Sequence, residues 1–300
     1  IEGWDKSCAY CIVPFTRGKE RSRASGSILE EVRSLAGSGY TEVQLLGQNV
    51  NSYGDPSGEC ADFAALLASV ALISGLRRVR FATSHPRDFS RSIVDVIDAH
   101  PVLCDHVHLP VQSGSTAVLE RMRRLYTRDD YLRRIEWLKG ARRSIALTSD
   151  VIVGFPGETE KDFEQTLSLL EEVRFDSLFS FKYSPRPNTS ALELDGRVPQ
   201  EEAGRRLTLL QEKQRAIQIQ RNSGLVGTLH EVMVEGFNRP TGQWIGRTSQ
   251  NRVLNFLAPP GSGSLAGRYV EVRVTRAGPN SLAGESVEQA RICSNGLGGS

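Results

Sequence analysis

The sequence predicts an α/β fold, a partial (β/α)6 barrel, followed by a small all-β barrel. From Ser27 to Tyr183, helical and strand patterns alternate at regular spacing, which is typical of a parallel sheet with right-handed crossovers. About six such units are too few for a closed eight-unit barrel, so we expect an open one. From Gly227, five short alternating runs separated by Gly, Pro and Asn favour a small antiparallel barrel.

Caps and apolar periodicity predict the helices of the first region. Ser27-Ile28-Leu29-Glu30 has the pattern of a capping box, and its helix should end near Gly37 or Gly39. Asp62 is expected to cap an apolar helix that continues through Ile73. The same reasoning predicts further helices over Ile93–Ala99, from Thr127 to Ala141, and over Glu160–Val173.

Short apolar runs between these helices predict buried strands. The expected strands are Glu42–Leu46, Arg78–Thr83, His106–Leu109, Ile145–Val153 and Asp176–Tyr183. The chain opens inside what resembles the end of another strand, Ile1-Glu2-Gly3. We therefore expect a fragment whose first barrel strand is truncated.

A break rich in Pro and turn residues, Pro185–Pro199, separates the two regions. The long helix after it, from Glu201 to about Arg221, is expected to pack on the side of the barrel. Short strands are then expected at His230–Val234, Gln243–Arg247, Arg252–Phe256, Tyr269–Thr275 and Ser281–Val287. The predicted domains are thus residues 1–222 and 223–290, with a disordered Gly/Ser-rich tail at 291–300.

Composition narrows the class of protein. The 300 residues are 39% hydrophobic and 24% charged, as in ordinary soluble chains, and the net charge of +2 is too balanced to indicate nucleic acid by itself. No apolar run approaches the roughly 20 residues that span a bilayer. Five cysteines without disulfide spacing favour a reduced, cytoplasmic setting.

Cys8 and Cys11 are the candidate metal ligands. Cys-x-x-Cys spacing occurs in zinc sites, redox dithiols and iron–sulfur loops. No second Cys or His pair at zinc-ligand spacing is present, and Pro14 follows Cys11 too closely for the usual redox motif. The pair matches the back half of a CxxxCxxC loop, in which Trp4 takes the place of the first cysteine. Spacing alone does not decide between these three kinds of site.

Polar or glycine residues occur at the ends of several predicted strands. The segments are Leu46-Gly47-Gln48-Asn49, Thr83-Ser84-His85-Pro86, Leu109–Gly114 and Ser149-Asp150. Carboxyl ends of parallel strands converge on one mouth, where such folds bind ligands. At Gly154 the backbone is expected to approach a flat ligand closely. Each segment, taken singly, could equally be a turn that ends a buried strand.

Four segments together resemble the radical S-adenosylmethionine (radical SAM) methylthiotransferases. They are Cys8–Gly18, Leu45–Asn51, His108–Ser115 and Ser149–Thr159, and the resemblance runs from residue 1 to about residue 290. Within this family, Pro14–Gly18 and Gly47–Asn51 resemble the branch that acts on isopentenylated adenosine in tRNA. The C-terminal barrel resembles the TRAM module, an RNA-binding domain.

The resemblance implies cofactors and residue roles. Cys8 and Cys11 would ligate a 4Fe-4S cluster with Tyr10 packed near it, and S-adenosyl-L-methionine (SAM) would bind the open iron. The implied SAM contacts are Gln48 and Asn49 to the methionine end, Gln112, Ser113 and Asp150 to the ribose, and Ile152 and Val153 beside the adenine.

The implied reaction adds a methylthio group to carbon 2 of an isopentenylated adenosine next to the anticodon, after an adenosyl radical abstracts hydrogen. The implied partners are the anticodon stem-loop of tRNA and a reductant such as flavodoxin or ferredoxin, with no membrane, and the protein is expected to be a monomer. Two alternatives stay open: a ribosomal-protein methylthiotransferase, which differs in substrate, and a cluster-less RNA-binding remnant.

Two departures from the family pattern predict impaired activity. An indole at Trp4 cannot replace a thiolate ligand, and the family's N-terminal domain, which holds a second 4Fe-4S cluster, is absent from this chain. Cys60 is a less favoured substitute ligand, and Cys104 and Cys293 are expected to be inert.

Basic residues near aromatic ones are the candidate RNA contacts. In the cluster loop region these are Arg17, Lys19 and Arg21, together with Arg23, and in the small barrel Arg247 and Arg252, together with Arg239 and Arg273. Phe237 and Trp244 are candidate stacking rings. A solvated loop explains the first group equally well, and Trp244 could equally belong to the core.

Overall fold

The computed structural model describes Gly3, residues 8–82 and residues 84–287. It divides into two compact units, Ile1–Ile217 and Gln218–Ser300, and the division falls inside helix α8 (Gln200–Ser223). The expected tail at 291–300 lies outside the described residues, as does Trp4. None of the helices formed by the described residues has the length and apolarity needed to cross a bilayer.

The first unit contains parallel strands in chain order. β1 (Glu42–Leu46) pairs with β2 (Arg78–Ala82), and β3 (His106–His108), β4 (Ala146–Val153) and β5 (Ser177–Lys182) form a second parallel sheet. A parallel bridge between Val79 and Leu103 links the two sheets. The predicted α/β fold is therefore confirmed. Of the expected truncated strand end, Ile1 and Glu2 lie outside the described residues, and Gly3 is not in a strand.

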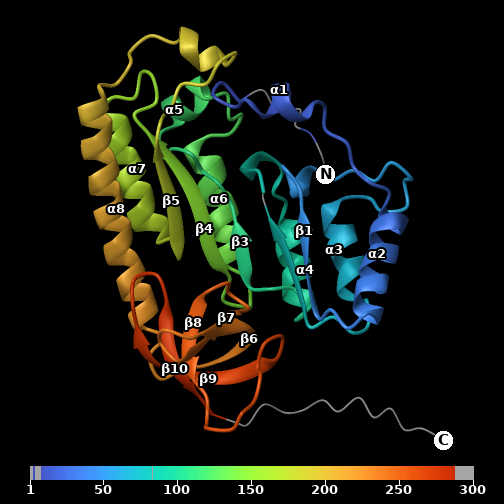
Figure 1. Cartoon of the computed structure of the whole chain (residues 1–300). Coiled ribbons are helices and arrows are strands. Elements are labelled where there is room, and N and C mark those ends of the chain that lie inside the picture. The colour runs from blue at the N-terminus through green and yellow to red at the C-terminus, as the bar shows by residue number, and fades with distance from the viewer. Residues whose placement is uncertain (1–2, 4–7, 83, 288–300) are drawn as a thin grey trace, which may run out of the picture. The chain divides into compact units, whose positions relative to one another are not determined.

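Helices alternate with these strands as the sequence predicts. The long ones are α2 (Ser25–Gly37), α3 (Phe63–Ala71), α4 (Arg91–Ala99), α6 (Arg128–Lys139) and α7 (Glu160–Val173). Asp62 caps α3 by accepting a hydrogen bond from the N–H of Ala65, as expected. Two short helices, α1 (Val13–Arg17) and α5 (Thr116–Arg121), were not predicted, because five or six residues show no clear period. Figure 1 shows α1 and α5 beyond the same end of the strands.

The expected capping box at Ser27 is wrong. Helix α2 begins at Ser25, and its first turn is held from a distant loop instead. Asp55 accepts hydrogen bonds from the N–H of Ser25 at 3.1 Å and from its hydroxyl at 2.7 Å. A carboxylate at a helix N-terminus satisfies a free N–H and complements the helix dipole, so the local cap was not needed.

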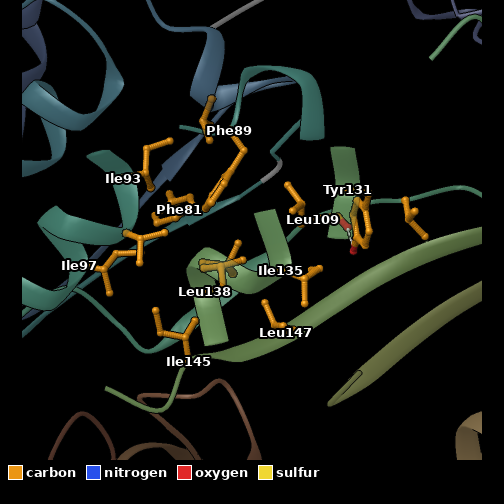
Figure 2. Packing of buried hydrophobic residues seen from close by; sticks show 14 of the residues in the cluster. Phe81, Phe89, Ile93, Ile97, Leu109, Tyr131, Ile135, Leu138, Ile145 and Leu147 are labelled. Atoms are coloured by element: carbon orange, nitrogen blue, oxygen red, sulfur yellow. Dashed lines mark hydrogen bonds between the residues drawn. The ribbon is translucent and has the colours of Figure 1, made fainter. Parts of the chain in front are cut away.

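One face of the strands is buried under the helices. Figure 2 shows side chains of β2, α4, α6 and β4 pointing toward one another, among them Phe81, Ile97, Leu138 and Leu147. Along β4 the burial alternates, so that Ser149 and Val151 face this core while Asp150 and Ile152 are half-buried on the other face. Parallel strands thus present a separate inner face to a ligand.

The second unit is a five-stranded closed barrel. Its strands are β6 (Leu229–Asn238), β7 (Gln243–Thr248), β8 (Val253–Leu257), β9 (Tyr269–Ala277) and β10 (Leu282–Ser286). The small all-β barrel is confirmed, with one correction to its expected antiparallel pairing. β10 closes the barrel by pairing parallel with β8 as well as antiparallel with β9. Val232, Leu254 and Phe256 lie in its buried core.

Candidate functional site

Backbone hydrogen bonds hold the Cys8–Cys11 loop in place. The N–H of Ala9 donates to the carbonyl of Met122 at 2.9 Å, and the carbonyl of Ala9 accepts from the N–H of Ala191 at 2.8 Å. The N–H of Cys11 donates to the carbonyl of Cys8 at 3.1 Å, which closes the turn between the two cysteines. Cys8 is buried and Cys11 half-buried, and both are free thiols. The turn is therefore fixed between the end of α5 and the segment after β5.

An apolar cluster surrounds this loop on one side. The ring of Tyr10 meets Phe155 edge-on at 6.1 Å between centroids, and Phe155 meets Tyr183 in the same way at 5.1 Å. Burial raises the pKa of the Cys11 thiol and of the Tyr10 phenol. Tyr10 therefore stays a neutral packing residue beside the thiols.

On its other side, the Cys8 thiol faces a buried arginine that the sequence analysis missed. Nη1 of Arg124 lies 3.4 Å from the Cys8 sulfur, and Nη2 donates to the carbonyl of Pro110 at 3.3 Å. Pro110 belongs to the segment that follows β3, so the thiol lies close to a strand carboxyl end. Arg124 gave no signal in the sequence, because it is one of several arginines after α5.

Three of the expected SAM contacts come together at the end of β4. The N–H of Gln112 donates to the carbonyl of Asp150 at 2.8 Å, and its carbonyl accepts from the N–H of Ile152 at 2.9 Å. Gln112 adopts a φ of 72°, a conformation that is uncommon for a residue other than glycine. Strained backbone at the end of a strand is typical of binding sites.

A polar row on the inner face leads to Asp150. Thr148 Oγ1 lies 3.0 Å from His106 Nε2 and 2.9 Å from His108 Nδ1. Nε2 of His108 in turn lies 3.6 Å from Oδ1 of Asp150, whose side chain remains partly exposed. The ring of His108 also packs edge-on against the exposed Phe179 of β5. Both histidines therefore have a polar partner in Thr148, and His108 also contacts Asp150.

The side chains of two other expected SAM contacts, Asn49 and Ser113, form hydrogen bonds with other residues of the protein. The Asn49 amide donates to Asp88 at 2.7 Å, and its oxygen accepts from the N–H of His85 at 3.1 Å. The fully buried Ser113 has its hydroxyl 3.4 Å from that of Thr166 and accepts from the N–H of Ser115 at 3.2 Å. Gln48 is half-buried. The side chains of Asn49 and Ser113 fix the strand ends rather than face an open space.

Gly154, in the turn after β4, does not have the role expected for it, which was a close approach to a flat ligand. A Cβ on Gly154 would lie 2.7 Å from the Cβ of Ala203 in α8, so helix packing takes the space that a flat ligand was expected to fill. The N–H of Gly154 donates to Glu158 Oε2 at 2.6 Å. The close approach at this glycine is therefore structural.

Comparison with known protein families shows which superfamily this chain belongs to. Residues 5–170, more than half of the chain, match the Radical SAM superfamily, and residues 225–287 match the TRAM domain. The chain belongs to the radical SAM superfamily. Its cysteine turn and the ends of β3 and β4 all lie within the matched radical SAM domain.

Two curated relatives are similar over nearly the whole chain. A protein of Solibacter usitatus is 67% identical over 287 residues, which cover 95% of this chain and 64% of the relative. A protein of Koribacter versatilis is 59% identical over 288 residues, which cover 96% of this chain and 65% of the relative. Both are named tRNA-2-methylthio-N(6)-dimethylallyladenosine synthase. The chain thus spans just under two thirds of the length of these relatives.

The metal-binding side chains of the radical SAM domain, Cys8 and Cys11, fit part of an iron–sulfur cluster site. Membership of this superfamily implies a 4Fe-4S cluster and SAM. The two free thiols on one turn, with a buried cation beside them, suit an anionic iron–sulfur group. Among the described residues, no group of three or more His, Cys, Asp or Glu side chains gathers to hold a metal. Cys60 and Cys104 are free thiols elsewhere in the domain.

The candidate RNA contacts differ in how available they are. Arg17, Lys19, Arg21 and Arg23 are all exposed, and Arg23 pairs with Glu31 at 2.6 Å. In the TRAM domain, Arg252 donates to Asn222 Oδ1 at 2.6 Å and Arg247 pairs with Glu235 at 2.9 Å. Both TRAM arginines are therefore engaged within their own unit.

The two candidate stacking rings of the TRAM domain contact each other. Phe237 and Trp244 lie opposite one another in the β6–β7 ladder, with ring centroids 4.9 Å apart. Trp244 packs partly against the barrel core, and Phe237 is 48% exposed. Trp244 therefore supports Phe237, which is the ring that solvent reaches.

Proposed function

We propose that the protein to which this chain belongs is a radical SAM methylthiotransferase acting on tRNA. It would add a methylthio group to carbon 2 of an isopentenylated adenosine next to the anticodon, in the cytoplasm and with a reductant such as flavodoxin or ferredoxin. The observation that carries the proposal is the fixed cysteine turn, whose Cys8 thiol is linked through Arg124 to the segment after β3, in a chain that also carries a TRAM domain. The names of its relatives support the substrate.

The radical SAM domain offers residues for each part of the cofactor. When bound at Cys8 and Cys11, a 4Fe-4S cluster supplies the electron that cleaves SAM. Gln112, Asp150 and Ile152 line one strand end, where the carboxylate suits ribose hydroxyls and the apolar side chain suits adenine. Asp150 is held in place by His108. We assign Asn49 and Ser113 to positioning these strand ends, and Gln48 to the methionine end of SAM.

We infer that this chain, as it stands, has impaired activity. It contains two of the three thiolates that the loop pattern requires, with Trp4 at the third position. A cluster held by two thiolates has less charge and fewer bonds to the protein, so it should be lost readily.

Anaerobic reconstitution with iron and sulfide tests the ligand assignment. We expect the W4C variant to hold more iron and sulfide per chain than the unmodified chain. W137C is the matched control, because it introduces the same cysteine on α6, away from the Cys8 turn, and far-UV circular dichroism checks its fold. Equal iron content in all three proteins would contradict the assignment of Cys8 and Cys11 with position 4.

Binding to RNA separates the proposal from its alternatives. We expect the chain to bind an anticodon stem-loop containing isopentenylated adenosine more tightly than a stem-loop of unrelated sequence. Stem-loop binding by a chain that takes up no iron, even as W4C, would instead support an RNA-binding remnant. Binding of a ribosomal protein with no preference for the stem-loop would support the ribosomal-protein branch.

A further inference from the structure

Arg124 is a buried cation without a carboxylate partner in the described part of the chain. The residue is 4% exposed. Its guanidinium donates to the phenol oxygen of Tyr126 at 3.1 Å and to the carbonyl of Pro110 at 3.3 Å, and its Nη1 faces the Cys8 sulfur at 3.4 Å. A guanidinium remains charged in proteins. Among the described residues, its hydrogen-bond partners are a phenol, a backbone carbonyl and the sulfur of Cys8, so no carboxylate balances this buried positive charge there.

The backbone around Arg124 is strained so that its side chain points inward. Arg123 and Leu125 have φ values of 56° and 60°, in the left-handed region that favours glycine. Both flanking side chains are exposed, Leu125 by 65%, whereas Arg124 and Tyr126 are buried. A residue other than glycine in this region is strained, because its Cβ comes too close to the backbone. The inward direction of the Arg124 side chain is therefore accompanied by backbone strain at Arg123 and Leu125 and by the exposure of Leu125.

Structural hydrogen bonding alone does not account for this arrangement. A neutral side chain of similar length could bridge the carbonyl of Pro110 and the hydroxyl of Tyr126 without the cost of burying a charge. The effective penalty for an unpaired buried ion is several kcal/mol. The cost is offset if the thiolates and the group they hold carry negative charge.

We propose that Arg124 is a positioning residue for the iron–sulfur cluster, donating an N–H···S hydrogen bond to Cys8 and supplying the positive charge that faces the bound cluster. This inference rests on the function proposed above. Hydrogen bonds to cluster sulfurs and nearby net charge set the reduction potential. The guanidinium favours the more negative, reduced state, so Arg124 raises the potential and slows the loss of iron.

The test uses the W4C chain as parent, so that all three thiolates are present. R124M removes the charge and the hydrogen bond, and R124K keeps the charge without the planar fork. R123M is the matched control, because it removes the same charge from an exposed neighbour with the same sign of φ. The readouts are iron and sulfide per chain, the rate of iron loss to a chelator, and the midpoint potential from a spectroscopic redox titration.

We expect R124M to have a more negative midpoint potential and faster iron loss than its parent, R124K to lie between them, and R123M to match the parent. Loaded R124M and R124K clusters with the parent's potential would overturn the inference and leave the proposed function standing. If circular dichroism shows that R124M does not fold, R124K decides alone: a potential equal to that of the parent overturns the inference. Failure of W4C itself to take up iron would contradict the cluster assignment, and the role of Arg124 with it.

Discussion

Arg206 and Glu158 form an ion pair that is buried on both sides. Nη1 of Arg206 lies 2.8 Å from Oε2 of Glu158, and the two side chains are 6% and 0% exposed. The same carboxylate oxygen accepts the N–H of Gly154, so the pair ties the turn after β4 to α8. Burial raises the pKa of the Glu158 carboxyl, against the opposing effect of Arg206. The pair therefore holds the glycine turn in place.

Removing one member of this pair should destabilise the fold strongly. We expect R206M to lower the free energy of unfolding by about 3–5 kcal/mol, because it leaves a buried carboxylate without its counter-ion. R205M is the matched control on the same helix, since Arg205 makes solvent-screened ion pairs with Glu160 and Glu202, and its removal should cost far less stability. Urea unfolding followed by far-UV circular dichroism measures both, and equal losses would contradict the assignment.

The packing of Gly154 against α8 gives a second prediction. G154A should lower the free energy of unfolding by about 2–4 kcal/mol, since it adds the strain of a positive φ to a clash with Ala203. G39A is the control, because Gly39 has a φ of 90° with nothing near its absent Cβ, so it reports the backbone strain alone. Thermal unfolding of the two variants compares them. Equal losses would mean that helix α8 moves to admit the methyl group.

The cap of α6 predicts a dependence of stability on pH. Asp130 accepts hydrogen bonds from the N–H of Thr127 at 3.1 Å and from its hydroxyl at 2.9 Å, and these bonds lower the pKa of its carboxyl. A lowered folded-state pKa stabilises the fold fully above the ordinary value of about 3.9, and this contribution disappears as the pH falls through the lowered value.

We therefore expect D130N to be less stable than the unmodified chain near neutral pH, because the capping box of α6 loses the carboxylate that accepts from Thr127. Its free energy of unfolding should also fall less steeply between about pH 5 and pH 2. D129N is the control, because the exposed Asp129 lies outside the capping box and its variant should keep the original slope. Urea titrations across this pH range give the two slopes, and parallel curves for D130N and the unmodified chain would refute the prediction.

Local sequence signals predicted the elements whose ends are fixed locally. Helix α7 runs over Glu160–Val173 as expected, because Thr159 and Asp162 form a true capping box and one face is apolar. The prediction that Asp62 caps α3 is correct for the same reason, since its hydrogen bond is local. The capping box predicted at Ser27 is wrong because Asp55, 30 residues from Ser25 in the chain, accepts the hydrogen bond from the first N–H of α2. A cap supplied by tertiary structure leaves no local pattern.

The residues of the candidate site also divide into those that local sequence signals could predict and those that depend on tertiary contacts. The thiol pair could be found from its spacing, and Gln112 and Asp150 from their place at strand ends together with the family resemblance. Arg124 could not, because its contact with Cys8 joins residues 116 positions apart. The side chain of Ser113 looked available in the sequence, yet its buried hydroxyl faces Thr166 of α7. Strand ends can be predicted from periodicity, but which way a side chain turns there depends on packing between distant elements.

If the proposed function holds, the ring pair of the TRAM domain predicts where an unstacked base of the RNA would bind. Trp244 is held against the barrel core and Phe237 is exposed, so Phe237 offers a supported ring for stacking. We expect F237A to weaken binding of the anticodon stem-loop by about 1–3 kcal/mol, roughly ten- to a hundredfold, with little loss of stability.

L257A is the matched control for this prediction. Leu257 is exposed to a similar degree on β8 and is apolar, but it cannot stack on a base. Fluorescence anisotropy with a labelled stem-loop measures the affinity of each variant at one fixed salt concentration, since the phosphate contribution changes with salt. Equal weakening by L257A and F237A would show that apolar area rather than ring stacking drives binding at this surface. Unchanged affinity in F237A would place the RNA on another face of the barrel.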